Sequence, residues 1–390
     1  MAQTTASLEA HFGELADPRR DRGKNHLLIE IIIMAVVAVI GGANDWVHVE
    51  LFCRSKEKWL RSDLKLKLPY GVPSHDTFGR VFSLLSPDAF QRCFINWVRA
   101  MVHLKVGEVV ALDGKHLRRS HDRFYGKDAV MMLNACATES GLALGTRDVP
   151  EDPNEISTLP EMLKLLVLAG CIVTADAAHC QAENTRQVIE QGSDYVLALK
   201  ANQGGLYAEV EQAFAAEQDR GFKEVRHETL TTREKDHGRV ETRRYVLLTD
   251  PEYIDYFNRD GKWWGLAAVG MVERTREVNG QVERQTHYYI TSLARDAAHP
   301  AQGIVEAFAR AVRSHWHVEN KLHWVLDVVF REDDSRARIG RVSENLALLR
   351  QMALNLLRRD DTPKLSLTSK RLKAGWDNDF LLKVVASAVP

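Results

Sequence analysis

The 390-residue chain is 45% hydrophobic and 27% charged, with a formal net charge of −1. This length predicts two or three domains, and the composition excludes a chain that is disordered throughout. The near-zero charge argues against a simple polycation that coats nucleic acid, but it leaves room for local basic patches. Five scattered cysteines without a CxxC pair predict reduced thiols in a cytosolic protein, and indicate neither a zinc ribbon nor a disulfide framework.

The first 105 residues are predicted to be helical. Their strongest apolar run spans residues 27–40 and contains Glu30. Since this run is shorter than the roughly 20 residues that a membrane span needs, we interpret it as a buried helix and expect no membrane association. Two later helices begin after Ser74 and at the Ser86–Pro87 pair, because a serine hydroxyl caps the free N–H groups of a first turn and proline suits its first position.

The pattern changes at Val109, where short apolar and β-branched runs begin. The predicted order is strands at 109–113, 130–138 and 142–149, a helix at 154–170, a strand at 171–176, a helix at 181–192 and a strand at 194–201. A three-strand meander followed by crossovers predicts a mixed sheet that is covered by helices. Residues 202–292 form a second β-rich segment, and helical character returns at residues 305–330.

Two acidic residues stand at the ends of predicted strands. Asp113 ends the first strand, and Asp176 ends the strand after the first crossover helix. Parallel neighbouring strands lie about 4.8 Å apart, so these carboxylates would share one small space. Like charges at such a distance raise a pKa unless a cation lies between them, and Mg²⁺, which prefers oxygen ligands, is the natural cation. Either aspartate alone is more typical of a turn residue or a helix N-cap.

A third carboxylate lies in the stretch HWHVENKLHW, residues 315–324. On a helix, one apolar stripe predicts packing against the sheet, and it consists of Val318, Leu322, Val325 and Val329. Glu319 then lies at the edge of this interface and can supply a third metal ligand. His323 follows one turn later, where it can contact a phosphate or a water molecule.

Other interpretations of this stretch are open. Zinc bound by His315, Glu319 and His323 is geometrically possible, although the HExxH spacing of zinc hydrolases is missing. An ordinary structural helix with solvated His and Glu side chains is the second alternative. If Glu319 is not the third ligand, the next candidates are Asp327, Asp333 and Asp334.

Nine segments along the chain carry a family resemblance. They are DPRRDRGKNHLL, GGANDW, GVPSHDTFGRVF, ALDGKHLR, IVTADAAHCQ, DYVLALKANQ, HGRVETR, YYITSL and HWHVENKLHW. In this order they resemble the motifs of DDE transposases of bacterial insertion sequences, and of the H-repeat-associated, ISAs-type group in particular. The resemblance runs nearly from end to end, and many ordered motifs at suitable distances make it specific.

The resemblance implies an α/β fold with a ribonuclease H-like mixed-sheet catalytic core, a β-rich insertion and a helical N-terminal domain. It places a catalytic and metal-binding triad on Asp113, Asp176 and Glu319. The long gap between Asp176 and Glu319 fits an insertion, since a connection of that length needs structure of its own. The expected division is a helical, DNA-binding domain at 1–105, the first part of the core at 106–201, the insertion at 202–292, and the second part of the core, with the glutamate helix and a C-terminal tail, at 293–390.

The implied activity is that of a transposase, which cleaves and joins the ends of an insertion sequence by two-metal phosphoryl transfer. The implied cofactor is Mg²⁺, with Mn²⁺ as a substitute. The implied partners are double-stranded DNA, namely the terminal inverted repeats of the element and the target, and a second copy of the chain in a homodimer on DNA. The expected location is the cytoplasm, at the nucleoid. The alternatives are a DDE-type nuclease that cuts without joining and a domesticated, non-transposing DNA-binding protein.

Basic side chains near these motifs are expected to hold the DNA. The predicted contacts are Lys115, Arg119, Arg239, Arg243 and His323. Arg239 and Arg243 face the same side of a strand, which suits a grip on a phosphate backbone.

The chain departs from its relatives around the glutamate. Many related transposases have a Tyr, an Arg and a Lys there, whereas the corresponding positions here hold Val312, His315 and Leu326. The candidates to replace their phosphate contacts are His315 and His323, or Lys321 and Arg313.

Overall fold

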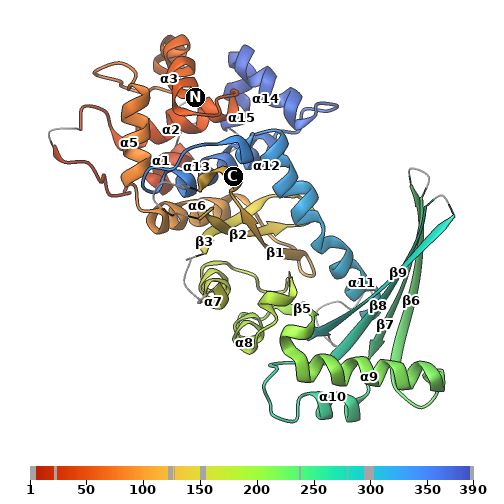
Figure 1. Cartoon of the computed structure of the whole chain (residues 1–390). Helices are drawn as coiled ribbons and strands as arrows, with labels where there is room; N and C mark the ends of the chain where they lie inside the picture. The colour runs from red at the N-terminus through yellow and green to blue at the C-terminus, as the bar shows by residue number, and fades with distance from the viewer. Residues whose placement is uncertain are drawn as a thin grey trace.

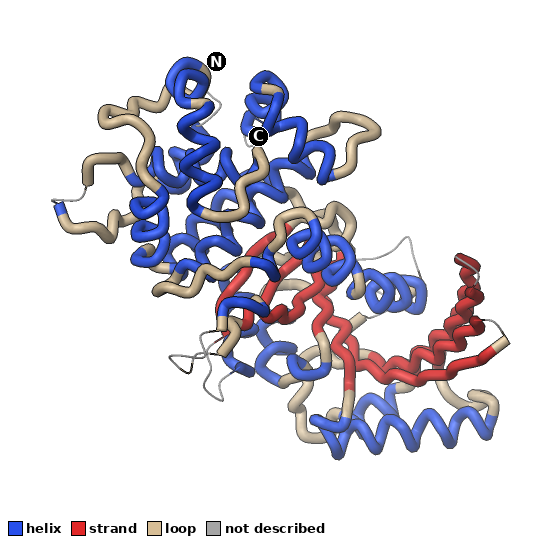
Figure 2. Tube along the Cα trace, turned by 45° about the horizontal axis from the view of Figure 1, so that its top comes forward, coloured by secondary structure: helices blue, strands red, loops and turns tan. Residues whose placement is uncertain are grey.

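The computed structural model describes residues 6–21, 24–121, 126, 128–149, 155–236, 239–278, 280–293 and 303–386. A body rich in helices contains both ends of the chain, and a long twisted sheet leads away from it (Figures 1 and 2). The core sheet lies between these two parts.

One nine-stranded sheet runs from the core into the insertion. Its strands are β1 (Val109–His116), β2 (Met131–Ala137), β3 (Ala143–Val149), β4 (Ile172–Ala175), β5 (Asp194–Leu199), β6 (His227–Asp236), β7 (Arg239–Leu248), β8 (Ala268–Val278) and β9 (Gln281–Thr291). Their spatial order is β3-β2-β1-β4-β5-β9-β8-β7-β6. β1, β2 and β3 form an antiparallel meander, while β4 pairs with β1 and β5 in parallel. This order, antiparallel from β3 to β1 and parallel from β1 to β5, confirms the predicted mixed sheet.

The β-rich segment at residues 202–292, the expected insertion, continues the core sheet. Its last strand, β9, pairs antiparallel with β5, where Leu197 lies opposite Ile290. β6 to β9 form an antiparallel meander whose far end projects from the body (Figure 1). The insertion also contains α9 (Gly204–Arg220) and α10 (Pro251–Phe257), two helices that its β-rich pattern did not predict. α9 packs against β9, and α10 packs against α9.

The helical body combines the two ends of the chain. Its N-terminal helices are α1 (Ala6–Phe12), α2 (Leu28–Ile40), α3 (Trp46–Ser55), α4 (Glu57–Ser62), α5 (His75–Leu84) and α6 (Pro87–Met101). Its C-terminal helices are α13 (Val342–Arg359), α14 (Leu367–Trp376) and α15 (Asn378–Ala386). As predicted, α2 is buried, and it packs against α13. Ser74 and Ser86 cap α5 and α6. Within the described ranges, no helix is long and apolar enough to cross a membrane.

Helices cover both faces of the core sheet. α11 (Ile304–His315) packs on the face that carries Val109, Ile172 and Val196. α7 (Glu155–Leu165) and α8 (Ala182–Glu190) contact β3 and β5 respectively and share a separate apolar cluster with Val173 and Tyr195.

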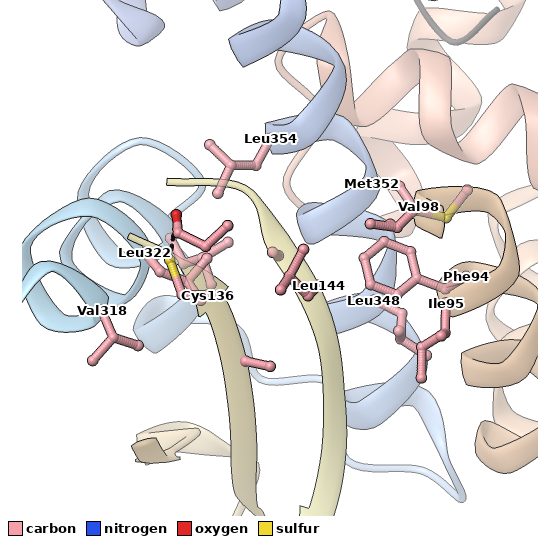
Figure 3. Close-up of a cluster of buried hydrophobic side chains, with 14 of the residues drawn as sticks. Phe94, Ile95, Val98, Cys136, Leu144, Val318, Leu322, Leu348, Met352 and Leu354 are labelled. Atoms are coloured by element: carbon pink, nitrogen blue, oxygen red, sulfur yellow. Dashed lines mark hydrogen bonds between the residues drawn. The ribbon is translucent and has the colours of Figure 1, made fainter. Parts of the chain in front are cut away.

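The same large cluster joins the core sheet to the helical body. Figure 3 shows side chains of α6 and α13 beside β3, and side chains of the glutamate helix beside β2. The labelled residues are Phe94, Ile95 and Val98 of α6, Leu348, Met352 and Leu354 of α13, Leu144 of β3, Cys136 of β2, and Val318 and Leu322. The sheet and the helices therefore share one core.

A buried arginine ties the C-terminal helices to the N-terminal ones. Arg371 of α14 is 7% exposed. It donates hydrogen bonds to the carbonyl oxygens of Val39 (3.0 Å), Ala43 (2.8 Å) and Val329 and to Oδ1 of Asn44 (2.8 Å). Burial lowers its pKa to about 10. Because the carbonyl groups at a helix end have no partner within the helix, Arg371 satisfies the end of α2.

We expect Arg371→Met to lower the free energy of unfolding by about 3 kcal/mol, because it leaves several buried carbonyl groups without a donor. Urea denaturation followed by circular dichroism measures this loss. Lys373→Met on the same helix is the matched control, since Lys373 is 44% exposed and its loss should leave the midpoint near the wild-type value. Equal midpoints for the two variants would contradict the role given to Arg371.

Candidate active site

The parallel pairing of β1 and β4 brings the two aspartates to one edge of the sheet. Leu112 and Ala175 are the last paired residues of this ladder, and Asp113 and Asp176 follow them directly. The prediction that Asp113 ends its strand is wrong, because antiparallel pairing with β2 continues β1 to His116. Asp113 is therefore fixed within a strand, whereas Asp176 lies just beyond the end of one.

The third carboxylate comes from a helix that changes its winding at the site. α11 ends at His315, a π-helical segment spans Val318–His323, and α12 (Trp324–Val328) follows. The predicted apolar stripe is confirmed, since Val318, Leu322, Val325 and Val329 are all buried. The expected continuous α-helix is not, because residues Val318–His323 form a π-helical segment. Such segments are frequent at functional sites.

Glu319 and His323 face β1 from the π-helical segment. Oε2 of Glu319 lies 3.0 Å from Nδ1 of His323, and the same nitrogen lies 3.7 Å from Oδ2 of Asp113. Ligand atoms of Asp113, Glu319 and His323 all lie within 4.8 Å of one another. His315 instead hydrogen-bonds Oγ1 of Thr174 on β4, at 3.0 Å. The alternative zinc set of His315, Glu319 and His323 is therefore not assembled.

The acidic residues repel one another. Burial raises the pKa of Asp113 to about 7, and the charges of Asp176 and Glu319 contribute to this shift. Oδ1 of Asp176 is buried without a hydrogen-bond partner. In the part of the chain that the structure describes, no lysine or arginine forms an ion pair with these three carboxylates. A cation would relieve the repulsion, so the residues present fit a divalent metal ion.

A buried ion-pair network lies beside the acidic group. Lys115 of β1 contacts Asp327, and its Nζ lies 2.7 Å from Oε2 of Glu332. Arg350 of α13 lies 3.8 Å from the other oxygen of Glu332. Asp327, one of the alternative third ligands, is thus paired with a lysine. The other two alternatives, Asp333 and Asp334, pair with Arg118 at 3.1 Å and with Arg119 at 3.7 Å.

The side chains predicted to contact DNA differ in exposure. Arg119 and Arg239 are exposed. Lys115, Arg243 and His323 are each 9% exposed or less. Lys115 lies in the network described above, Arg243 contacts Glu241, and His323 lies behind Glu319. Because these three side chains are buried, DNA cannot reach them at the surface. The expectation that they contact DNA is therefore corrected.

Two polar residues behind the acidic group were not predicted. Asn134 of β2 lies opposite Asp113 in the antiparallel ladder. Its Nδ2 lies 3.2 Å from Nε2 of His323, and its Oδ1 accepts a hydrogen bond of 2.8 Å from Gln351 of α13. Both residues lie in apolar stretches of sequence, where nothing marks them as functional. Only the β1–β2 register places Asn134 at the site.

Comparison with known proteins identifies the family. A family model described as "Transposase DDE domain" matches residues 105–356, and one described as "DDE_Tnp_1-associated" matches residues 9–98. The "H repeat-associated putative transposase YhhI" of Escherichia coli (strain K12) is 35% identical over 98% of both chains. The "Uncharacterized protein in dhlA 3'region" of Xanthobacter autotrophicus is 42% identical over 73% of this chain and 94% of its own length.

Among solved structures, a piggyBac transposase synaptic complex with hairpin DNA aligns with 98% of this chain and 81% of that chain. Its TM-score is 0.42 at 10% sequence identity, which is too low to carry an argument. The family assignment rests on the sequence matches, which span both the N-terminal helices and the core sheet. The chain belongs to the DDE transposase family, in its H repeat-associated group.

Proposed function

We propose that this transposase uses Mg²⁺ to cleave the ends of an insertion sequence and to join them to target DNA. The observation that carries the proposal is the acidic group formed by Asp113, Asp176 and Glu319 without a paired lysine or arginine among the described residues. Mg²⁺ suits this group because it prefers oxygen ligands and takes few protein carboxylates, which leaves positions for phosphate oxygens and water. Mn²⁺, which also favours carboxylates, should substitute.

The three acids would hold two ions. When bound, these would neutralise charge on the phosphate and lower the pKa of the attacking water or 3′-hydroxyl group. The protein's own contribution is positioning. Asp113 is held by its pairing with β2, one residue after the last pair of the β1–β4 ladder, Asp176 by the end of β4, and Glu319 by the hydrogen bond with His323. These three anchors belong to separate elements of one core, so the carboxylates are placed before any substrate binds.

We extend the proposal to DNA binding and assembly. Arg119 lies close in sequence to Asp113, and Arg239 opens β7 in the projecting part of the sheet. Exposed arginines at these places suit contact with phosphate groups along one duplex. Since an element has two ends that are joined together, we infer a homodimer that assembles on DNA.

The first prediction concerns the acids. Asp113→Asn, Asp176→Asn and Glu319→Gln should each lower Mg²⁺-dependent cleavage of the element's terminal DNA by about 10³-fold or more, since each removes a ligand on which phosphoryl transfer depends. DNA binding should persist. A strand-cleavage assay on labelled terminal DNA, with a gel-shift assay beside it, measures both.

Asp255→Asn, at an exposed position on α10, is the matched control and should cleave like the wild type. Full cleavage by Glu319→Gln would remove Glu319 from the site. A product that is cut but never joined would favour the nuclease alternative, and a wild type that binds DNA without cutting would favour the domesticated binder.

The second prediction concerns pH and stability without metal. The pKa of Asp113 is raised from 3.8 to about 7 in the folded protein, so its contribution to stability falls as the pH rises from about 4 to about 7. Asp113→Asn should therefore melt above the wild type at pH 8, by about 2 °C if the difference is about 1 kcal/mol. The gap should shrink near pH 5. At pH 8, millimolar Mg²⁺ should raise the melting temperature of the wild type but not that of Asp113→Asn.

Differential scanning calorimetry at the two pH values measures these melting temperatures. Asp255→Asn should melt with the wild type throughout. A wild type that melts above Asp113→Asn at pH 8 without metal would show that the carboxylates do not repel one another as argued.

The third prediction concerns DNA contacts. Arg119→Ala and Arg239→Ala should each weaken binding to all DNA sequences alike, and each should reduce the slope of log Kd against log salt concentration by about 1. Fluorescence anisotropy from low to moderate salt measures this slope. Arg259→Ala is the control, because two hydrogen bonds of 2.7 and 3.1 Å hold Arg259 on Glu209. Arg119, by contrast, has a longer contact of 3.7 Å with Asp334. An unchanged slope in Arg239→Ala would remove the projecting sheet from the DNA interface.

A further inference from the structure

His323 has hydrogen-bond partners on both ring nitrogens. Nδ1 lies 3.0 Å from Oε2 of Glu319, and Nε2 lies 3.2 Å from Nδ2 of Asn134. The ring is 2% exposed, so water does not reach it freely. A neutral imidazole donates from one nitrogen and accepts at the other, and the surroundings decide which.

The orientation of the Asn134 side-chain amide determines which nitrogen of His323 carries the proton. The main-chain carbonyl of Met132 lies 3.3 Å from Nδ2 of Asn134. A carbonyl oxygen only accepts, so the amide nitrogen, and not the amide oxygen, must face Met132. With the amide in this orientation, Oδ1 accepts a hydrogen bond of 2.8 Å from Nε2 of Gln351 on the opposite side. The orientation thus follows from the network as a whole.

The orientation of Asn134 fixes the position of the proton on His323. Nδ2 of Asn134 donates to His323, so Nε2 of the ring carries no proton. The ring proton is then on Nδ1, where it donates to the carboxylate of Glu319. A nitrogen that carries a proton cannot bind a metal ion, and the lone pair of Nε2 is taken by Asn134. Although His323 lies within ligand distance of Asp113 and Glu319, neither nitrogen is free to coordinate.

We propose that Asn134, supported by Gln351, holds His323 in its Nδ1–H tautomer, and that His323 is a positioning residue for Glu319 and not a metal ligand. The part of this proposal that concerns metal binding rests on the proposed function of the site. The π-helical segment contributes to this role, because it contains both Glu319 and His323 and ends at the histidine. Groups that orient a metal-binding carboxylate typically change metal affinity or activity by about 10- to 100-fold when they are removed.

The tautomer can be measured without metal or DNA. We would label the histidines of the full-length protein with ¹⁵N and record long-range ¹H–¹⁵N spectra at pH 7.5, with the His323 signal identified by its loss in His323→Asn. We expect the Nδ1–H form in the wild type. Asn134→Asp, whose carboxylate only accepts, should move the proton to Nε2 or add a second one. An Nε2–H form in the wild type would overturn the proposal even if the variant failed to fold.

The metal provides an independent readout. Pulsed electron paramagnetic resonance of bound Mn²⁺ should show no coupling to a directly bound histidine nitrogen, and such a coupling would overturn the proposal. Asn134→Asp should raise the Mn²⁺ dissociation constant by about tenfold or more. His323→Asn keeps an N–H donor near the Nδ1 position, so its Mn²⁺ dissociation constant should rise less than that of His323→Leu. Equal losses in these two variants would contradict orientation by hydrogen bonding.

Asn345→Ala is the matched control. Asn345 is equally buried and donates to the carbonyl oxygens of Phe82 and Leu85, away from the site. Its loss should lower stability and leave Mn²⁺ affinity unchanged. A wild type that binds no Mn²⁺ would count against the proposed function, while the tautomer measurement would still decide the role of Asn134.

Discussion

Electrostatic repulsion among Asp113, Asp176 and Glu319 is the constraint on which the rest of the site depends. Three acids with no paired lysine or arginine among the described residues are costly in a folded protein. Burial raises the pKa of Asp113, and the charges of Asp176 and Glu319 raise it further. The fold holds them together by placing each on a separately anchored element. The β1–β2 ladder fixes the first, the end of a strand fixes the second, and an apolar stripe with a histidine fixes the third. The shared core supplies the free energy that opposes the repulsion.

The charged residues next to the acidic group are arranged differently. Lys115, Asp327 and Glu332 also cluster beside β1, but each acid there has a cation within contact distance. In that network, acidic and basic side chains are paired within the protein. The acidic triad has a neutral histidine and an asparagine behind it instead, which leave its negative charge in place.

Much of this arrangement could be predicted from the sequence. The succession of strands and helices along the core, the mixed sheet, the buried α2 helix and both serine caps follow from local patterns. The edge shared by Asp113 and Asp176 was expected on the condition that their strands are parallel neighbours, which the structure meets. The π-helical segment could not be predicted, because α and π turns bury the same apolar residues. α9 was hidden by a weakly amphipathic sequence within a β-rich segment. The burial of Lys115 and the role of Asn134 depend on contacts between distant segments, which no local pattern encodes.

The pairing of β5 with β9 has a consequence for how this protein could be shortened. Backbone groups of β5 from Val196 to Leu199 are satisfied by β9. A chain trimmed of its insertion would leave that side of β5 as an open edge, and unpaired edges attract strands from other molecules. The pairing with β9 therefore closes an edge of the core sheet. Viable deletions in this lineage should shorten the far ends of β6 to β9 and spare the residues that flank β5.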